Sequence, residues 1–126
     1  MLGANFLDLE PLNLREADFI VVPIPYEATT TYGGGTRYGP WALLEASTQV
    51  ELWDEEVDYD FTRNLRIATA PPITPEAEGP AAMLAKIKKR VRPWISDGKR
   101  LLSLGGEHTI TLALVEAYLT KYPDLT

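Results

Sequence analysis

The sequence of 126 residues contains no cysteine and only one histidine, His108. Without cysteine, disulfide bonds and thiolate zinc sites are excluded, and the redox compartment is left open. Basic residues are also few, because 12 Lys and Arg stand against 18 Asp and Glu and give a net charge of −6. That balance argues against a nucleic-acid-binding surface.

Long hydrophobic runs are absent as well. The longest apolar stretch, around Phe19 to Pro25, is far shorter than the ~20 residues that a membrane-spanning helix needs. The first ten residues, Met1 to Glu10, lack the basic start and the long apolar run of a signal peptide. We therefore expect a soluble cytoplasmic protein that makes no membrane contact. The length suits one small domain.

Three apolar segments, each bounded by proline or glycine, predict β-strands. They cover residues 19–22, 65–69 and 100–104. Pro23 is expected to end the first strand, because proline has no backbone N–H to donate to a neighbouring strand.

Helical patterns follow each of these strands. The predicted helices cover residues 41–50, 74–95 and 110–119, with Pro93 kinking or ending the second. In the first, Ala42, Leu43 and Ala46 fall near one face. The acidic segment 51–60 is predicted to be a solvated loop anchored by Trp53. The alternation of strands and helices predicts an α/β fold with a mostly parallel sheet.

The segment 105–109, Gly-Gly-Glu-His-Thr, joins the third predicted strand to the third predicted helix. It places an imidazole at the carboxyl end of a parallel strand, where open α/β sheets bind ligands. From spacing alone, a purely structural His108 that caps or underlies the helix is the simpler interpretation. Glu107 is open to two roles: a group that supports a ligand, or an exposed carboxylate favoured by the helix dipole.

The glycine-rich loop 32–37 precedes a predicted helix, so phosphate binding is an alternative for this segment. The loop matches neither the P-loop pattern nor the dinucleotide fingerprint. Arg37 is expected to pair with a carboxylate of the loop or to lie at a subunit contact. Tyr26, Glu27 and Tyr32 follow the first strand and could border a substrate entrance, although packing is the expected role of both tyrosines.

Two motifs in this order resemble the ureohydrolase family of arginases and agmatinases. The first comprises residues 23–27 (Pro-Ile-Pro-Tyr-Glu), the threonines at 29–31 and residues 35–40 (Gly-Thr-Arg-Tyr-Gly-Pro). The second is the 105–109 segment. The resemblance covers essentially the whole chain and is nearest to agmatinases. It implies a three-layer αβα fold, of which residues 1–126 would form a single incomplete domain, the N-terminal part.

The resemblance also implies a chemistry. The family holds two Mn²⁺ ions bridged by a hydroxide, which attacks the guanidinium carbon of agmatine and yields urea and putrescine. His108 matches the histidine of the family's first metal motif and is therefore expected to be a metal ligand. Where the family often has aspartate, this chain has Glu107. A small guanidino substrate and a homo-oligomer, either a trimer or a hexamer, are further implications.

Two later family motifs, Asp-x-His-x-Asp and Asp-x-Asp, do not occur in these 126 residues. The sequence looks interrupted before a fourth strand, and we expect this chain alone to be inactive. The alternative is a short binding or scaffold module, derived from the same fold, that pairs with a partner. In isolation we expect low stability and exposed apolar surface, because an open parallel sheet lacks its neighbours.

Overall fold

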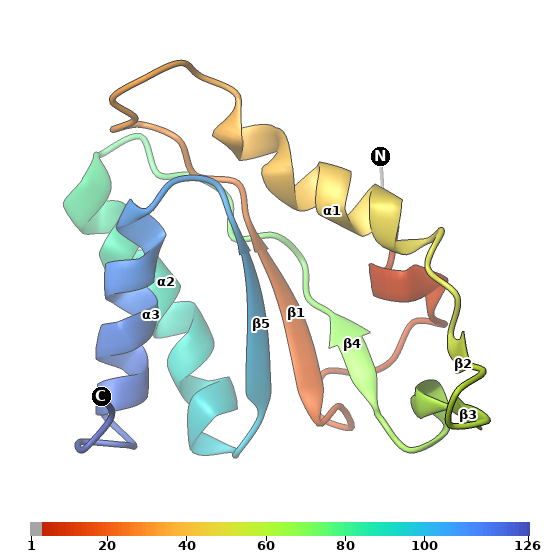
Figure 1. The fold of residues 1–126 in the computed structure, drawn as a ribbon. Helices are drawn as coiled ribbons and strands as arrows, with labels where there is room; N and C mark the ends of the chain where they lie inside the picture. The colour runs from red at the N-terminus through yellow and green to blue at the C-terminus, as the bar shows by residue number, and fades with distance from the viewer. Residues whose placement is uncertain (1–3) are drawn as a thin grey trace.

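Three parallel strands form the centre of the protein in the computed structural model, which describes residues 4–126 (Figure 1). The spatial order is β4–β1–β5, so β1 is central. Phe19 of β1 pairs with Ile67 of β4 on one side and with Arg100 of β5 on the other. The strand bounds are Phe19–Ile24 for β1, Ile67–Thr69 for β4 and Arg100–Gly105 for β5. The predicted α/β fold with a mostly parallel sheet is confirmed.

Pro23 lies inside β1, so the prediction that it ends the strand is wrong. On the β4 side of β1, the carbonyl oxygen of Val21 accepts a hydrogen bond from Ala70 N–H at 2.8 Å, and that of Pro23 accepts one from Ile73 N–H at 2.9 Å. Because β4 already ends at Thr69, the nitrogen of Pro23 faces a side where the strand ladder has stopped. The missing N–H therefore removes no bond between paired strands.

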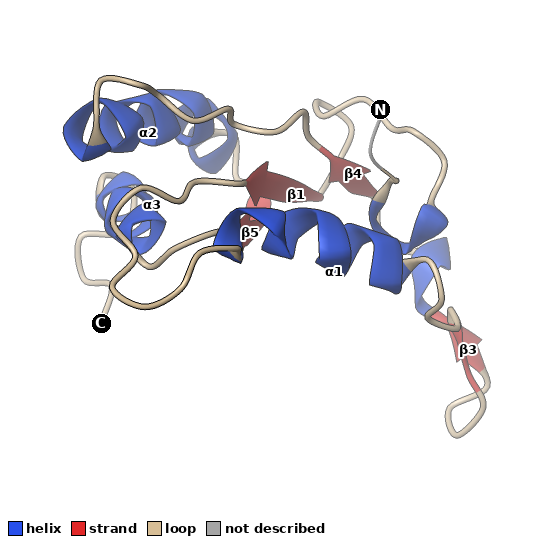
Figure 2. Cartoon of the chain, turned by 90° about the horizontal axis from the view of Figure 1, so that it is seen from above, coloured by secondary structure: helices blue, strands red, loops and turns tan. Residues whose placement is uncertain are grey.

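The helices cover both faces of the sheet, with α1 on one face and α2 and α3 on the other (Figure 2). Their bounds are Gly39–Ser47 for α1, Pro80–Ser96 for α2 and Thr109–Leu119 for α3. Helix α2 begins later than predicted, because Gly79 has a φ of 101°, outside the helical range, and Pro80 provides the first turn. It continues beyond Pro93 to Ser96, so the proline does not end it.

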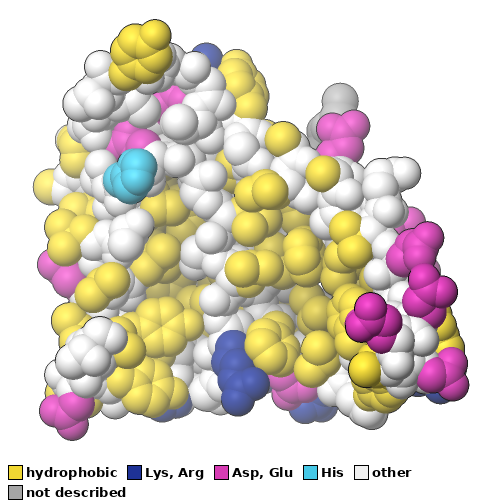
Figure 3. All heavy atoms as spheres, in the orientation of Figure 1, with side chains coloured by type: hydrophobic (Ala, Val, Ile, Leu, Met, Phe, Trp, Pro, Cys, Tyr) yellow, Lys and Arg dark blue, Asp and Glu magenta, His cyan; other side chains and the backbone are white. Residues whose placement is uncertain are grey.

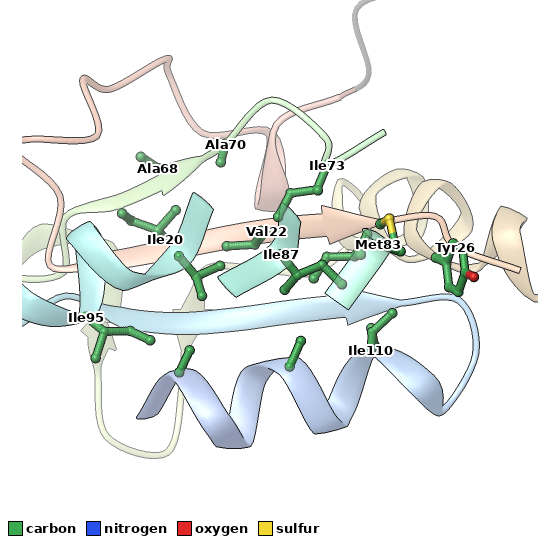
Figure 4. Packing of buried hydrophobic residues seen from close by; sticks show 14 of the residues in the cluster. Ile20, Val22, Tyr26, Ala68, Ala70, Ile73, Met83, Ile87, Ile95 and Ile110 are labelled. Carbon is green, nitrogen blue, oxygen red and sulfur yellow. The ribbon is translucent and has the colours of Figure 1, made fainter. Parts of the chain in front are cut away.

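The larger core lies between the sheet and the pair α2–α3 (Figure 4). Alternate residues of β1 point into it, as expected for a strand whose side chains alternate between faces. Helix α2 contributes one buried residue per turn, which is the periodicity expected of a helix packed on one face. The members from these two elements are Ile20, Val22, Ile24, Met83, Ile87, Val91 and Ile95.

The smaller core, under α1, is formed by Val21, Leu44 and Leu104. Ala42, Leu43 and Ala46 are exposed, so the predicted packing face of α1 is wrong. Helix α1 instead buries Leu44 together with Ser47, whose hydroxyl donates to the carbonyl oxygen of Leu44 and accepts from Leu7 N–H at 2.8 Å. Hydrophobicity alone could not identify this face, because a serine with both bonds satisfied occupies it.

The acidic segment is a short antiparallel hairpin and not a plain loop. Its strands are β2 (Trp53–Asp54) and β3 (Tyr59–Asp60), and it projects away from the sheet (Figure 2). Trp53 is 46% exposed, so it does not anchor the segment to the core as predicted. Within residues 4–126, no helix combines the length and the apolar character that a membrane span requires.

Candidate functional site

The candidate site lies at the carboxyl ends of the adjacent strands β1 and β5 (Figure 1). From β1 the chain leads to α1 on one face of the sheet, whereas from β5 it leads to α3 on the other face. Two neighbouring strands whose connections leave to opposite faces create a crevice at their carboxyl ends, where open α/β sheets bind ligands. An open cleft of about 380 Å³ lies here, lined by residues 29–32, Thr36 and residues 106–109.

Glu107 holds the two loops of this cleft together. One carboxylate oxygen, Oε2, accepts hydrogen bonds from the backbone N–H groups of Ala28 and Thr29, each at 2.8 Å. The other, Oε1, accepts from the hydroxyl of Thr29. The backbone N–H of Glu107 in turn donates to the carbonyl oxygen of Tyr26 at 2.9 Å. A single residue of the β5–α3 turn therefore binds three residues of the loop that follows β1.

The carboxyl group of Glu107 is buried, with only 6% of the residue exposed. Burial by itself would raise its pKa, but the hydrogen bonds from the Thr29 hydroxyl and from the backbone N–H groups of Thr29 and Ala28 outweigh burial. Together they lower the pKa of Glu107 to about 2, so the group is a carboxylate at neutral pH. Of the two roles open from the sequence, the exposed carboxylate at a helix start is therefore wrong.

His108 lies at the start of α3 with an exposed side chain, visible as the only histidine on the surface in Figure 3. Its imidazole makes no capping hydrogen bond to the helix. His108 nevertheless occupies the N-cap position of α3, and its carbonyl oxygen accepts from Thr111 N–H at 3.0 Å, so the predicted cap is present in the backbone but not in the side chain. The other structural role, a filler beneath the helix, is wrong because the side chain is exposed. His108 lines the cleft beside Glu107. Its role as a metal ligand stays a prediction.

A second carboxylate, Glu27, organises the glycine-rich loop. Its Oε2 accepts from Gly35 N–H at 2.6 Å, from the Thr36 hydroxyl at 2.7 Å and from Arg37 N–H at 3.2 Å. The Thr36 bond most strongly, and the backbone bonds with it, lower the pKa of Glu27 below its ordinary value although burial acts in the opposite direction. Arg37 approaches the other oxygen at 3.7 Å, so the predicted pairing of Arg37 with a loop carboxylate is confirmed.

This arrangement also decides against phosphate binding by the loop. The N–H groups of Gly35 and Arg37, which would have to face a phosphate, already donate to Glu27. A bound phosphate would also meet the negative charge of that carboxylate at short range.

The two tyrosines that follow β1 have opposite environments. Tyr26 is buried, as predicted, and its hydroxyl has no hydrogen-bond partner among residues 4–126. Burial, and to a smaller extent the charge of Glu107, raise the pKa of that hydroxyl. Tyr32 is 98% exposed and lines the cleft, so the expectation that it packs is wrong, whereas its position at the cleft entrance agrees with the other interpretation.

The described residues do not fit a complete metal centre. Between residues 4 and 126, no group of three or more histidine, cysteine, aspartate or glutamate side chains is arranged to hold an ion. Both oxygens of Glu107 are engaged with Ala28 and Thr29, and one oxygen of Glu27 is engaged with its own loop. In this part of the chain, the group at the cleft that is best placed to bind a metal is the imidazole of His108.

Sequence reasoning missed the parts played by Thr29 and Thr109. The hydroxyls of these two threonines lie 3.0 Å apart, and that of Thr29 donates to Glu107. The run of three threonines at 29–31 was the only available signal, since hydroxyl groups often bind a nearby carboxylate. The carboxylate concerned lies 78 residues away in the chain, so local sequence could not identify it.

The fold and the cleft define an α/β protein with an open cleft at the carboxyl edge of a parallel sheet. A model of the arginase family matches residues 17–126, and the chain belongs to that family. The expected family resemblance is thereby confirmed.

The chain is similar to curated enzymes of this family. It is 41% identical over 118 residues to an N(1)-aminopropylagmatine ureohydrolase from Synechocystis, with 90% of this chain and 39% of that protein aligned. It is 32% identical over 123 residues to an agmatinase from Bacillus subtilis, with 98% of this chain and 42% of that protein aligned. The chain thus spans about two fifths of the length of these relatives.

Solved structures show the same fold. A hypothetical agmatinase from Burkholderia thailandensis superposes with a TM-score of 0.84 at 29% identity, over 94% of this chain and 38% of that one. A formiminoglutamase from Trypanosoma cruzi, solved with Mn²⁺, superposes with a TM-score of 0.73 at 20% identity, over 86% of this chain and 38% of that one. The latter likeness concerns the fold alone.

Proposed function

We propose that residues 1–126 form the N-terminal part of a single ureohydrolase domain, which in complete form hydrolyses a small guanidino compound in a manganese-dependent reaction. The observation that carries this proposal is the exposed imidazole of His108, which is presented to an open cleft at the junction of β1 and β5. Family membership supports the reaction class, because the similar curated proteins are named agmatinase and N(1)-aminopropylagmatine ureohydrolase.

The proposed substrate is agmatine, which would give putrescine and urea. Agmatine and its aminopropyl derivative share a guanidino group on an aliphatic amine. The chain is more similar to the Synechocystis enzyme than to the Bacillus subtilis agmatinase. A substrate assay therefore has to include N(1)-aminopropylagmatine beside agmatine. His108 would supply one nitrogen ligand to the metal centre, and the remaining ligands would come from outside residues 4–126. A homo-oligomeric, cytoplasmic enzyme is part of the same proposal.

Intact mass and urea release together test this function. The protein is purified from its native source and weighed, and urea release is measured with agmatine, N(1)-aminopropylagmatine and arginine, with and without Mn²⁺. We expect a mass well above the 14.0 kDa of this chain, Mn²⁺-dependent urea release from agmatine, and no release by the isolated 126 residues.

Substitution of His108 makes the test specific to this site. In the native-length protein, His108→Ala is expected to abolish urea release, whereas Lys89→Ala, at an exposed position on α2, leaves it unchanged. A native mass of 14.0 kDa together with no urea release would overturn the proposal in favour of a non-catalytic module that pairs with a partner.

A further inference from the structure

The turn that carries His108 is connected to the last residue of β1 and to the loop after it by hydrogen bonds in both directions. Gly106 N–H donates to the carbonyl oxygen of Ile24 at 3.3 Å and Glu107 N–H donates to that of Tyr26 at 2.9 Å. In the opposite direction, Ala28 and Thr29 donate their N–H groups to the Glu107 carboxylate. The two segments therefore continue their contact beyond the ends of the paired strands.

At the cleft, the contact between the two segments is made by the carboxylate of Glu107. Oε2 receives two N–H groups and Oε1 receives the hydroxyl of Thr29, so three donors converge on one side chain. The hydroxyl of Thr109, the residue after His108, lies 3.0 Å from the same Thr29 hydroxyl. Because Thr29 uses its proton for Glu107, the bond between the threonines takes its proton from Thr109. The residues on both sides of His108 are thus bound to Thr29.

We infer that Glu107 is a positioning residue: its carboxylate holds the turn to the loop after β1 and thereby fixes where the imidazole of His108 projects. Hydrogen bonds to an ionised acceptor are stronger than those between neutral groups, and the residue that accepts these three is itself buried. Glu107 is not itself a metal ligand in this arrangement, since its oxygens are engaged. The consequence for metal binding rests on the proposed function, whereas the positional role does not.

The test compares Glu107→Gln, Glu107→Asp and the matched control Glu27→Gln in the native-length protein. Glu27 is also a carboxylate that accepts backbone N–H groups and a threonine hydroxyl, but its bonds go to the loop at 35–37. Glutamine keeps the shape and puts an NH₂ group where an acceptor is required. Aspartate keeps both acceptor oxygens.

The first measurement is amide hydrogen exchange at Ala28 and Thr29. Glu107→Gln is expected to accelerate it by about tenfold, because bonds to a charged acceptor are lost. Glu107→Asp is expected to restore part of the protection, and Glu27→Gln is expected to leave these two amides unchanged. Unchanged exchange in Glu107→Gln would overturn the inference.

The second measurement reports on His108 itself. Its rate of modification by diethyl pyrocarbonate, followed by peptide mass spectrometry, is expected to change in Glu107→Gln but not in Glu27→Gln. The Kd for Mn²⁺ is expected to rise by about tenfold in Glu107→Gln, which is the effect typical of losing a group that orients a ligand. Accelerated amide exchange with neither change at His108 would mean a merely structural role and would overturn the inference.

The two proposals fail in different ways. Absence of Mn²⁺ binding and of urea release by the unaltered protein would contradict the proposed function, while amide exchange and His108 modification would still decide the role of Glu107. Should Glu107→Gln not fold, Thr29→Val removes one donor and retains the side-chain shape. It is expected to accelerate exchange at Ala28, and an unchanged rate there would count against the inference.

Discussion

Gly106 lies directly against the carbonyl oxygen of Tyr26, so closely that a Cβ atom at this position would overlap it. The added Cβ atom would lie well under 3.0 Å from this oxygen, a separation that real Cβ atoms essentially never show. The oxygen belongs to the backbone of Tyr26 and not to a flexible side chain. Glycine is therefore required where the β5–α3 turn passes the end of β1.

Gly106→Ala is accordingly expected to destabilise the protein by about 3 kcal/mol, the upper end of the range for overpacking, since overlap with backbone cannot be relieved by a change of rotamer. The free energy of unfolding in urea is the measurement. Gly33→Ala is the control, because Gly33 has a φ of +63° but an added Cβ atom there would have no neighbour within 4 Å. Only backbone strain of about 1 kcal/mol is expected at Gly33. Equal losses in the two variants would contradict the steric explanation.

The contribution of the Glu27 carboxylate to the free energy of unfolding is expected to depend on pH. The Thr36 hydroxyl and the loop N–H groups lower the pKa of Glu27 in the folded protein below its ordinary value of 4.5. A lowered folded-state pKa stabilises the folded state above pH 4.5, and this contribution is lost as the pH falls below that value. The difference in unfolding free energy between the unaltered protein and Glu27→Gln should be constant near neutrality and shrink under acid conditions. If this difference does not change with pH down to about 3, roughly one and a half units below the ordinary pKa, the carboxylate charge does not hold the loop.

The core under α2 offers a test of the packing. Ile87 is fully buried between α2 and the sheet. Ile87→Ala is expected to lower the unfolding free energy by about 2–5 kcal/mol, because buried methyl groups are lost and a cavity remains. Lys89→Ala, two residues along the same helix and exposed, should change it by less than about 0.5 kcal/mol. Similar values for the two variants would place Ile87 outside the core.

Apolar surface beside β5 predicts association of the isolated 126 residues. Leu102 on β5 is 43% exposed, and on α3 Leu112 is 53% and Val115 is 43% exposed. β5 is also an edge of the described sheet. We expect the isolated chain to self-associate and to bind a hydrophobic dye, and the double variant Leu102→Lys with Leu112→Lys to do so less. Sedimentation of both proteins provides the measurement. A monomer that melts cooperatively at high temperature would contradict the expectation.

Much of the fold followed from local sequence. The apolar segments 19–22 and 100–104 and the helical patterns over 74–95 and 110–119 predicted β1, β5, α2 and α3, because side-chain periodicity reflects which face is buried. The boundaries were less predictable. Pro23 continues its strand because the ladder beside its nitrogen has already stopped, and Pro93 is tolerated in the last turn of its helix.

The site was predictable in location but only partly in structure. The Gly-Gly-Glu-His-Thr segment and its family resemblance pointed to His108 at a sheet edge, and the exposed imidazole lies there. The burial of Glu107 was not predictable, because its donors belong to Ala28 and Thr29 in a distant segment. A glutamate that begins a helix in solvent and one buried by another loop have the same local sequence.

The amino-acid sequence alone determined the α/β alternation, the family and the candidate ligand His108, because each depends on residue types within short segments. The tertiary structure decided that Glu107 binds the loop after β1, that Glu27 occupies the amides of the glycine-rich loop, and that Ser47 faces the core. These relationships depend on which segments the parallel order β4–β1–β5 brings together. The pairing of strands distant in the chain, and not local propensity, sets that order.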